Sequence, residues 1–381
     1  MDRRLFLKGV GVLGCSAAAH PLMTAVTLAA TPGENRLVVI ILRGAMDGLD
    51  VVQPRGDRAL VAARPGMMAG ASDLDGFFAL HDGLSGLKPL WQAGELAFVH
   101  ATSTPYRDKR SHFDGQDLLE AGTGSDLAPA AQRDGWLNRL LTVLPGAQSE
   151  TAWAVGREML PVLAGAAPVQ AWSPDQDLAL SAPAQALLTH VYEGDPLFLQ
   201  ASGTAFGLAG MEDTGGRDAD LLSAFVAERL RAEARIASFS LTGWDTHKAQ
   251  ERAILRPLDQ LQRAVLGLKA GLGGDVWGKT VVLAMTEFGR TVRQNGSGGT
   301  DHGTGGAMLV AGGAVKGRQV LGRWPGLDEA DLYDRRDLMP TSDVRDWAAQ
   351  VIAGLYGTSR SVLETTVFPG LRIEAPPGLV L

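Results

Sequence analysis

The sequence predicts a three-layer α/β/α sandwich with a mostly parallel central sheet. Short apolar runs, typical of strands buried on both faces, alternate along the chain with longer amphipathic segments. Strands separated by helices indicate a parallel sheet with helices on both of its faces. The strand-like runs cover residues 36–42, 95–100, 235–241, 280–285 and 307–311.

The helical segments are recognised by apolar residues three or four positions apart. One of them follows Ser111, which could cap it, and stops at Gly122, a natural helix end. The expected helices cover residues 81–91, 112–121, 135–144, 181–192, 219–234, 248–272 and 344–356.

The composition is that of an ordinary globular protein, with 381 residues, 45% of them hydrophobic and 20% charged. Residues 1–30 contain three basic residues and one acidic residue, so the rest of the chain holds 32 basic and 41 acidic residues, a net charge of −9. Nucleic-acid binding needs clustered Lys and Arg, so we expect no nucleic-acid partner. We expect residues 31–381 to form one domain with a less regular insertion around 124–218.

The first thirty residues have the features of an export signal rather than of folded structure. Arg3 and Arg4 precede a weakly apolar run, and Thr27–Ala29 forms a small-residue cleavage site. Paired arginines followed by Phe-Leu-Lys predict the twin-arginine route, the alternative being a chance pair near the start of the chain. We therefore expect the twin-arginine translocase as a partner and a periplasmic or secreted location. No later run predicts a transmembrane helix.

The single cysteine, Cys15, lies inside this signal. Residues 12–15 faintly resemble a lipoprotein box, but the box comes early and Leu13 is atypical, so we do not expect lipid anchoring. The rest of the chain has no thiol and hence no disulfide and no cysteine nucleophile. Any metal must be held by oxygen and imidazole ligands.

Polar side chains follow four of the predicted strands. The carboxyl ends of parallel strands meet at one edge of a sheet, so we expect these groups to converge there. The candidates are Asp47, Asp50, Ser111, His112, Asp245, His247, Glu287, Arg290, Asp301 and His302.

Each candidate also has an ordinary structural interpretation. Asp47 and Asp245 could be turn residues or helix caps, Ser111 could be only a cap, and the loop 296–299 could use its glycines only to turn. The site interpretation is favoured because Asp and His recur at successive strand ends and occur together at two of them. Ser111 could also be a nucleophile, since a helix N-terminus stabilises an alkoxide and an incoming phosphate.

At these residues the chain resembles the alkaline phosphatase-like superfamily, which includes alkaline phosphatases, sulfatases and cofactor-independent phosphoglycerate mutases. Ser111–Gly122 is similar to the nucleophilic serine segment of the mutases, and Asp301-His302-Gly303 to a metal-binding motif. The chain resembles more closely a branch of exported bacterial proteins known as domain of unknown function 1501. The motifs that carry this second resemblance lie at residues 44–49, 111–113, 243–247, 287–290 and 299–303.

The resemblance implies hydrolysis of a phosphate or sulfate ester, in a small molecule or a polymer, with Ser111 as the nucleophile and His112 and Arg290 in the catalytic set. It implies divalent metals, Zn²⁺ or Mn²⁺ first, with Ca²⁺ and Mg²⁺ also compatible with carboxylates. The ligand sets it implies are Asp47, Ser111, Asp301 and His302 for one ion, and Asp245 and His247 for a second, with Glu287 as the candidate for a missing third ligand.

Two departures from the superfamily pattern keep a second function open. Asp245 and His247 are two positions apart where the superfamily usually has four, and no histidine follows His302. The alternative to a hydrolase is a catalytically degenerate protein that binds or assembles an envelope polymer. A serine hydrolase of the acyl-transfer kind is excluded by the lack of a Gly-x-Ser-x-Gly elbow.

Overall fold

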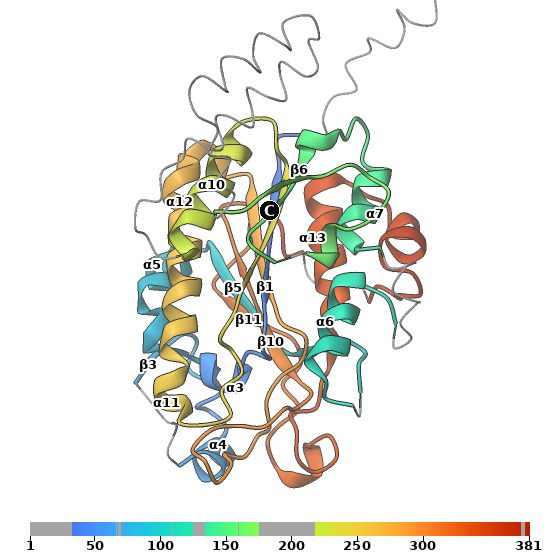
Figure 1. The fold of residues 1–381 in the computed structure, drawn as a ribbon. Coiled ribbons are helices and arrows are strands. Elements are labelled where there is room, and N and C mark those ends of the chain that lie inside the picture. Colours follow the sequence, from blue (N-terminus) through green and yellow to red (C-terminus); the bar gives the residue numbers. More distant parts are fainter. Residues whose placement is uncertain are drawn as a thin grey trace, which may run out of the picture.

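A mixed sheet of nine strands runs through the part of the chain that the computed structural model describes (Figure 1). The structure describes residues 33–65, 67, 70–107, 109–124, 134–158, 160–174, 218–374 and 378–381. The predicted export signal with Cys15, the helix predicted at 181–192 and much of the insertion predicted around 124–218 lie outside these residues.

The strand order of the sheet is β11-β5-β10-β9-β1-β8-β6-β7, and β12 pairs with β5. Every pair is parallel except the two that β10 makes with β5 and β9. The sheet is therefore mostly parallel, as predicted. The strands are β1 (Arg36–Leu42), β5 (Leu96–Ser103), β6 (Ala152–Val155), β7 (Gln170–Trp172), β8 (Ile236–Leu241), β9 (Thr280–Met285), β10 (Gly306–Ala311), β11 (Gln319–Leu321) and β12 (Ser342–Asp343).

The central strands are buried on both faces, which explains their continuous apolar sequence. All seven residues of β1 are buried. Because side chains alternate along a strand, Val38 and Ile40 pack into one apolar core while Val39 and Ile41 pack into another on the opposite face.

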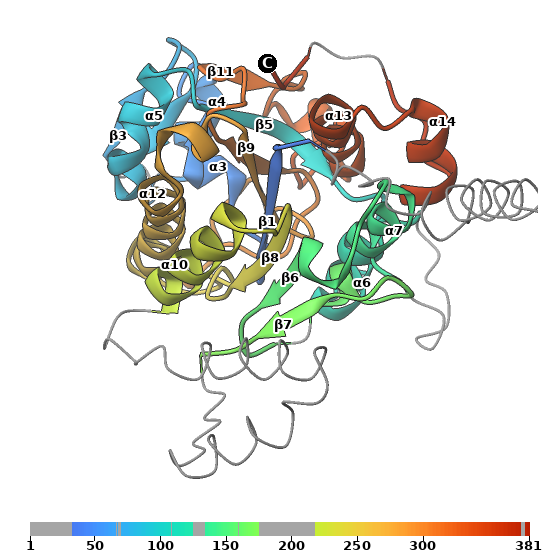
Figure 2. The same ribbon diagram turned by 90° about the horizontal axis from the view of Figure 1, so that it is seen from above.

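Helices cover both faces of the sheet (Figures 1 and 2), which confirms the predicted three-layer arrangement. One layer contains α5 (Lys88–Gln92), α10 (Asp218–Arg231) and α12 (Leu255–Trp277), and the other contains α6 (His112–Ala121), α7 (Trp136–Val143) and α13 (Val344–Tyr356). No helix among the described residues combines the length and the apolar character needed to cross a membrane.

Two of the predicted helices are each divided into two in the structure. The segment predicted at 81–91 consists of a 3-10 helix, Asp82–Leu87, followed by α5, whose first turn contains Pro89. The segment predicted at 248–272 is divided into α11 (Gln250–Ala253) and α12, which continues to Trp277. The first turn of α12 contains Pro257, where a missing N–H is tolerated.

The smaller elements lie mainly in the connections. They are α3 (Gly48–Val51), α4 (Arg58–Ala63), α14 (Arg360–Val362) and a three-stranded sheet of β2 (Val52–Gln53), β3 (Ala71–Asp73) and β4 (Ala79–His81). Strands β1, β5, β8 and β9 all point the same way, so their carboxyl ends share one edge of the large sheet. The loops that follow these strands carry the candidate site residues.

Candidate metal centre

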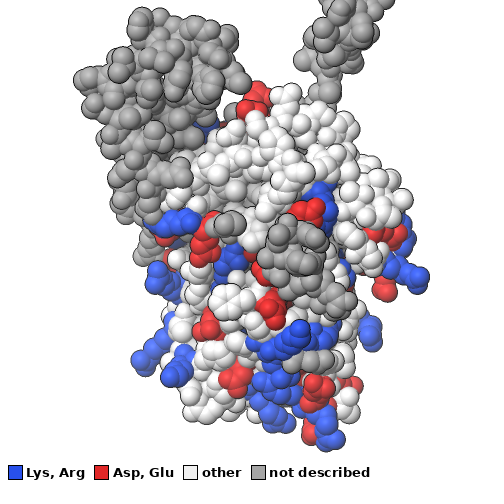
Figure 3. All heavy atoms as spheres, turned by 45° about the vertical axis from the view of Figure 1, so that its right-hand side comes forward, with Lys and Arg blue, Asp and Glu red and all other residues white. Residues whose placement is uncertain are grey.

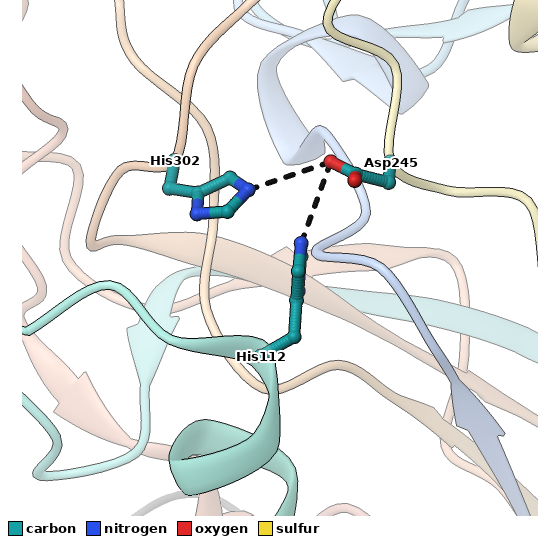
Figure 4. Close-up of side chains that lie close together, drawn as sticks. All are labelled: His112, Asp245 and His302. Atoms are coloured by element: carbon teal, nitrogen blue, oxygen red, sulfur yellow. Dashed lines mark ion pairs between the residues drawn. The ribbon is translucent and has the colours of Figure 1, made fainter.

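Two histidines and an aspartate from three separate segments face one another at this edge (Figure 4). His112 is the first residue of α6, Asp245 follows β8, and His302 lies in the loop between β9 and β10. The Nε2 atoms of His112 and His302 each lie 3.4 Å from Oδ1 of Asp245. Residues 190 positions apart in the sequence are thus brought within reach of one ion.

A third histidine, His247, adjoins this group. Its Nε2 atom lies 3.0 Å from Oδ1 of Asp245 and 2.9 Å from Nε2 of His302. Three imidazole nitrogens therefore surround a single carboxylate oxygen.

Each of the three rings is oriented by an acceptor at its other nitrogen. A carboxylate or carbonyl oxygen can only accept a hydrogen bond, so each Nδ1 carries a hydrogen and each Nε2 atom faces the centre. Metal-binding histidines are held in the same way. The Nδ1 pairs are His112 with Glu287 Oε1 at 2.8 Å, His302 with the Arg110 carbonyl at 2.8 Å, and His247 with Asp301 Oδ1 at 3.3 Å.

The centre has the donor set and spacing that a divalent cation requires. The Nε2 atoms of His112 and His302 and Oδ1 of Asp245 lie close enough together to hold one ion. His112 Nε2 is buried and has no hydrogen-bond partner. Tetrahedral zinc with ligands at about 2.0–2.1 Å separates them by roughly 3.3–3.4 Å, close to the distances from His112 and His302 to Asp245. These residues therefore fit a borderline divalent ion such as Zn²⁺.

The neighbouring charges favour ionised carboxylates. Burial raises the pKa of Asp245, but the hydrogen bond and charge of Arg290 outweigh it, so that the pKa lies below its usual value. Burial also raises the pKa of Glu287, but hydrogen bonds from His112 and other donors bring it below the usual value. The bond to Glu287 in turn raises the pKa of His112, whereas burial lowers that of His302.

Arg290 borders the centre on its buried side. Its buried guanidinium donates to Asp245 Oδ1 at 2.6 Å and to the carbonyls of Gly44 at 2.6 Å and Ala45 at 2.8 Å. It thus connects the loops after β1, β8 and β9. This contact with Asp245 would position the carboxylate for an ion.

Glu287 lies behind His112 rather than beside Asp245. Its fully buried carboxylate accepts from the amides of Gly44 and Ala45, both at 3.0 Å, and from Gln116 at 3.1 Å. Gly44 and Ala45 have φ values of 114° and 58°, and this tight turn points both N–H groups at one oxygen. In this position Glu287 orients an imidazole ring.

Asp47 lies in a separate buried network. Its Oδ2 accepts from Arg64 Nη1 at 2.7 Å and from Gln250 Nε2 at 2.6 Å, and its Oδ1 caps α3 through the amide of Leu49. Gln250 also donates to Asp50 at 2.8 Å. The structure therefore brings Asp47 to a guanidinium and an amide, not to the histidines.

Ser111 and Asp301 border the centre. Ser111 caps α6 through a 3.4 Å bond from the amide of Asp114, and its own amide donates to the Tyr106 hydroxyl at 2.9 Å. The Asp301 side chain is 51% exposed and accepts from Asn295 at 3.0 Å as well as from His247.

The sequence reasoning missed Arg64, Gln250 and Asn295. Arg64 and Gln250 belong to helical or loop segments without a polar motif, and they reach Asp47 across 17 and 203 positions. No local signal reveals such contacts. Asn295 precedes the glycine-rich loop and could have been singled out as a neighbour of Asp301.

Residues 208–367 match a family model described as "Protein of unknown function (DUF1501)". This stretch contains Asp245, His247, Glu287, Arg290, Asp301 and His302. No curated protein matches the sequence.

Several solved structures are similar to the chain at low sequence identity. A protein of the alkaline phosphatase superfamily from Vibrio parahaemolyticus has 12% identity and a TM-score of 0.39, over 85% of this chain and 67% of that chain. The lipoteichoic acid synthase LtaP from Listeria monocytogenes has 9% identity and a TM-score of 0.41, over 88% and 76%. The soluble domain of lipooligosaccharide phosphoethanolamine transferase A from Neisseria meningitidis has 10% identity and a TM-score of 0.37, over 74% and 79%.

Proposed function

We propose that this chain, whose residues 208–367 match the DUF1501 family, is an exported metal-dependent hydrolase of phosphate or sulfate esters. The observation that carries the proposal is the convergence of three imidazole Nε2 atoms on the Asp245 carboxylate. If Asp245 were only a turn residue or a helix cap, it would not need a buried arginine and three oriented imidazole rings around its carboxylate.

The ion would be held by His112, Asp245 and His302, with His247 beside them. An imidazole-rich ligand set suits Zn²⁺ best, whereas Mn²⁺, Ca²⁺ and Mg²⁺ prefer oxygen ligands. When bound, such an ion stabilises the negative charge that develops on the ester oxygens and the leaving group.

Ser111 is the proposed nucleophile. It precedes His112 directly and lies at the start of the ten-residue helix α6, whose N-terminus favours negative charge. Its Oγ atom would bond to the phosphorus or sulfur of the ester while the ester oxygen leaves with a proton. Water would then cleave the phospho- or sulfo-serine and release the inorganic anion.

The test combines metal analysis with an ester screen on protein purified after export. Wild-type protein should contain about one divalent ion per chain and hydrolyse a nitrophenyl phosphate or nitrophenyl sulfate. His302→Ala should lose both properties, whereas Ser111→Ala should keep the metal and lose turnover. His81→Gln is the matched control, because this buried histidine lies outside the centre, and it should keep both.

Other outcomes separate the candidates. Bound metal without turnover of any ester would favour the binding or assembly protein. Wild-type protein that stays free of metal after dialysis against Zn²⁺, Mn²⁺ and Ca²⁺ and cleaves neither ester would rule out the hydrolase.

Export is a separate part of the proposal and rests on Arg3 and Arg4. Replacing both with lysine should leave the protein in the cytoplasm, because the twin-arginine translocase reads this pair. An unchanged periplasmic yield in cell fractions would contradict this route.

A further inference from the structure

Two partly exposed arginines, Arg110 and Arg336, lie beside the centre and share one buried carboxylate. Arg110 Nη2 lies 3.3 Å from Asp337 Oδ2, and Arg336 Nη1 lies 2.9 Å from Asp337 Oδ1. The Asp337 side chain is 0% exposed, whereas those of Arg110 and Arg336 are 34% and 37% exposed. One negative charge thus pairs with two partly exposed cations, so the group of three keeps a net positive charge.

Both arginines form a hydrogen bond with His302. The carbonyl of Arg110 accepts from His302 Nδ1 at 2.8 Å, and Arg336 Nη1 donates to the carbonyl of His302 at 3.0 Å. The backbone of Arg110 and the guanidinium of Arg336 therefore contact a proposed metal ligand, and Asp337 joins the two guanidinium groups. Arg110 also directly precedes Ser111.

The backbone at Arg110 has an uncommon conformation. Its φ of 50° lies in the left-handed region, which residues other than glycine adopt rarely. A glycine would enter this region without strain but would have no cationic side chain. Strain of this kind concentrates at functional sites.

A further basic residue adjoins this pair, although the chain as a whole is acidic. The neighbouring Lys109 is exposed. Figure 3 shows Lys and Arg side chains, with Asp and Glu side chains among them, over the lower part of the molecule. Guanidinium groups bind phosphate and sulfate through two parallel hydrogen bonds.

We propose that Arg110 and Arg336 form an anion-binding lip that receives a second, non-reacting phosphate or sulfate group of the substrate. The inference rests on the proposed function, since it places the reacting ester at the centre and the second anion beside His302. The substrate class is then a molecule with several phosphate or sulfate groups rather than a lone monoester.

The lip can be tested by binding, without relying on turnover. Metal-loaded protein is titrated with dextran sulfate of low molecular mass, whose sulfate groups have many spacings, and with neutral dextran as the blank. Arg110→Gln/Arg336→Gln should raise the Kd for dextran sulfate by about tenfold or more, because charge-assisted hydrogen bonds are lost. Metal analysis of this variant checks that His302 is still in place.

The matched control removes the same charge from the opposite end of the sheet. Arg231 ends α10 just before β8 begins, and Arg360 follows α13, so both lie away from the centre. Arg231→Gln/Arg360→Gln should change the Kd by less than about twofold. Lys109→Glu is a second variant for the case in which the double variant fails to fold, and it should raise the Kd about threefold.

The result that overturns the lip is equal weakening by the two double variants, or no weakening by the first. Lip-dependent binding by a protein that hydrolyses no ester would remove the proposed hydrolase and leave the lip. The opposite result has two parts: the wild-type protein and the Arg110→Gln/Arg336→Gln variant hydrolyse nitrophenyl phosphate with the same KM, and dextran sulfate binding does not depend on the two arginines. That result would keep the proposed hydrolase and remove the lip.

Discussion

Replacing Glu287 with glutamine tests whether the hydrogen bond from His112 to Glu287 affects the metal affinity of the centre. The substitution keeps the shape of the side chain and removes its charge. Oε1 of Glu287 lies 2.8 Å from His112 Nδ1 and also accepts from the amides of Gly44 and Ala45. An amide oxygen can still accept, but the hydrogen bonds are no longer assisted by charge.

The size of the effect follows from these contacts. Loss of an oriented partner behind a metal-binding histidine typically lowers metal affinity by about 10- to 100-fold. Because the glutamine oxygen still holds His112, we expect the lower end, about tenfold, or roughly 1.4 kcal/mol. The free energy of unfolding should also fall by about 1–3 kcal/mol, since the carboxylate is fully buried among its donors.

The assay is competition for Zn²⁺ against a chromophoric chelator, with urea unfolding of the metal-free protein alongside. Glu120→Gln is the matched control. Glu120 is only 1% exposed, pairs with Arg43 at 2.9 Å and contacts no histidine of the centre. Both variants should lose stability, but only Glu287→Gln should lose zinc affinity. An unchanged zinc Kd in Glu287→Gln, or an equal loss in Glu120→Gln, would refute the orienting role.

Three further predictions concern other buried groups. Asp47→Asn should keep the metal but lose about 3 kcal/mol of stability, because it leaves the Arg64 guanidinium without its charge partner; loss of the metal would make Asp47 a ligand. Arg290→Lys should weaken metal binding severalfold. The lysine ammonium cannot replace a guanidinium group that joins the Asp245 carboxylate to several carbonyls. Zinc competition measures this loss. Burial lowers the pKa of His100 to about 4, below its unfolded value of 6.5, so its stabilising contribution is complete above pH 6.5 and falls by about 3 kcal/mol as the pH drops to 4; urea unfolding across this range should show a smaller dependence in His100→Gln.

The fold could be predicted because its strands are buried on both faces. The continuous apolar run of β1 matches the observed strand from Arg36 to Leu42. The same reasoning did not reveal that β10 is antiparallel. Its run, Gly306–Ala311, is fully buried like its neighbours, and an antiparallel strand covered on both faces has the same pattern as a parallel one.

The candidate site could be predicted only as a set of residues at one edge. Strand ends indicated that His112, Asp245 and His302 could meet, because parallel strands deliver their following loops to the same place. The sequence could not predict which group pairs with the Nδ1 atom of each histidine. The partner of His302 is a backbone carbonyl, that of Arg110, 192 positions away, and any residue type has such a carbonyl.

The two carboxylates at the ends of adjacent strands show how surroundings assign a role. Asp47 follows β1 and Glu287 follows β9, and both are buried and surrounded by donors. Asp47 pairs with the guanidinium of Arg64 at 2.7 Å, so a positive charge already lies opposite it. Glu287 faces amide groups and the ring of His112, which leave its charge available to polarise that ring toward the centre. An acidic residue after a strand can therefore cap a helix or orient a histidine, according to the groups opposite it, and opposite Asp47 these include Arg64 at the end of α4.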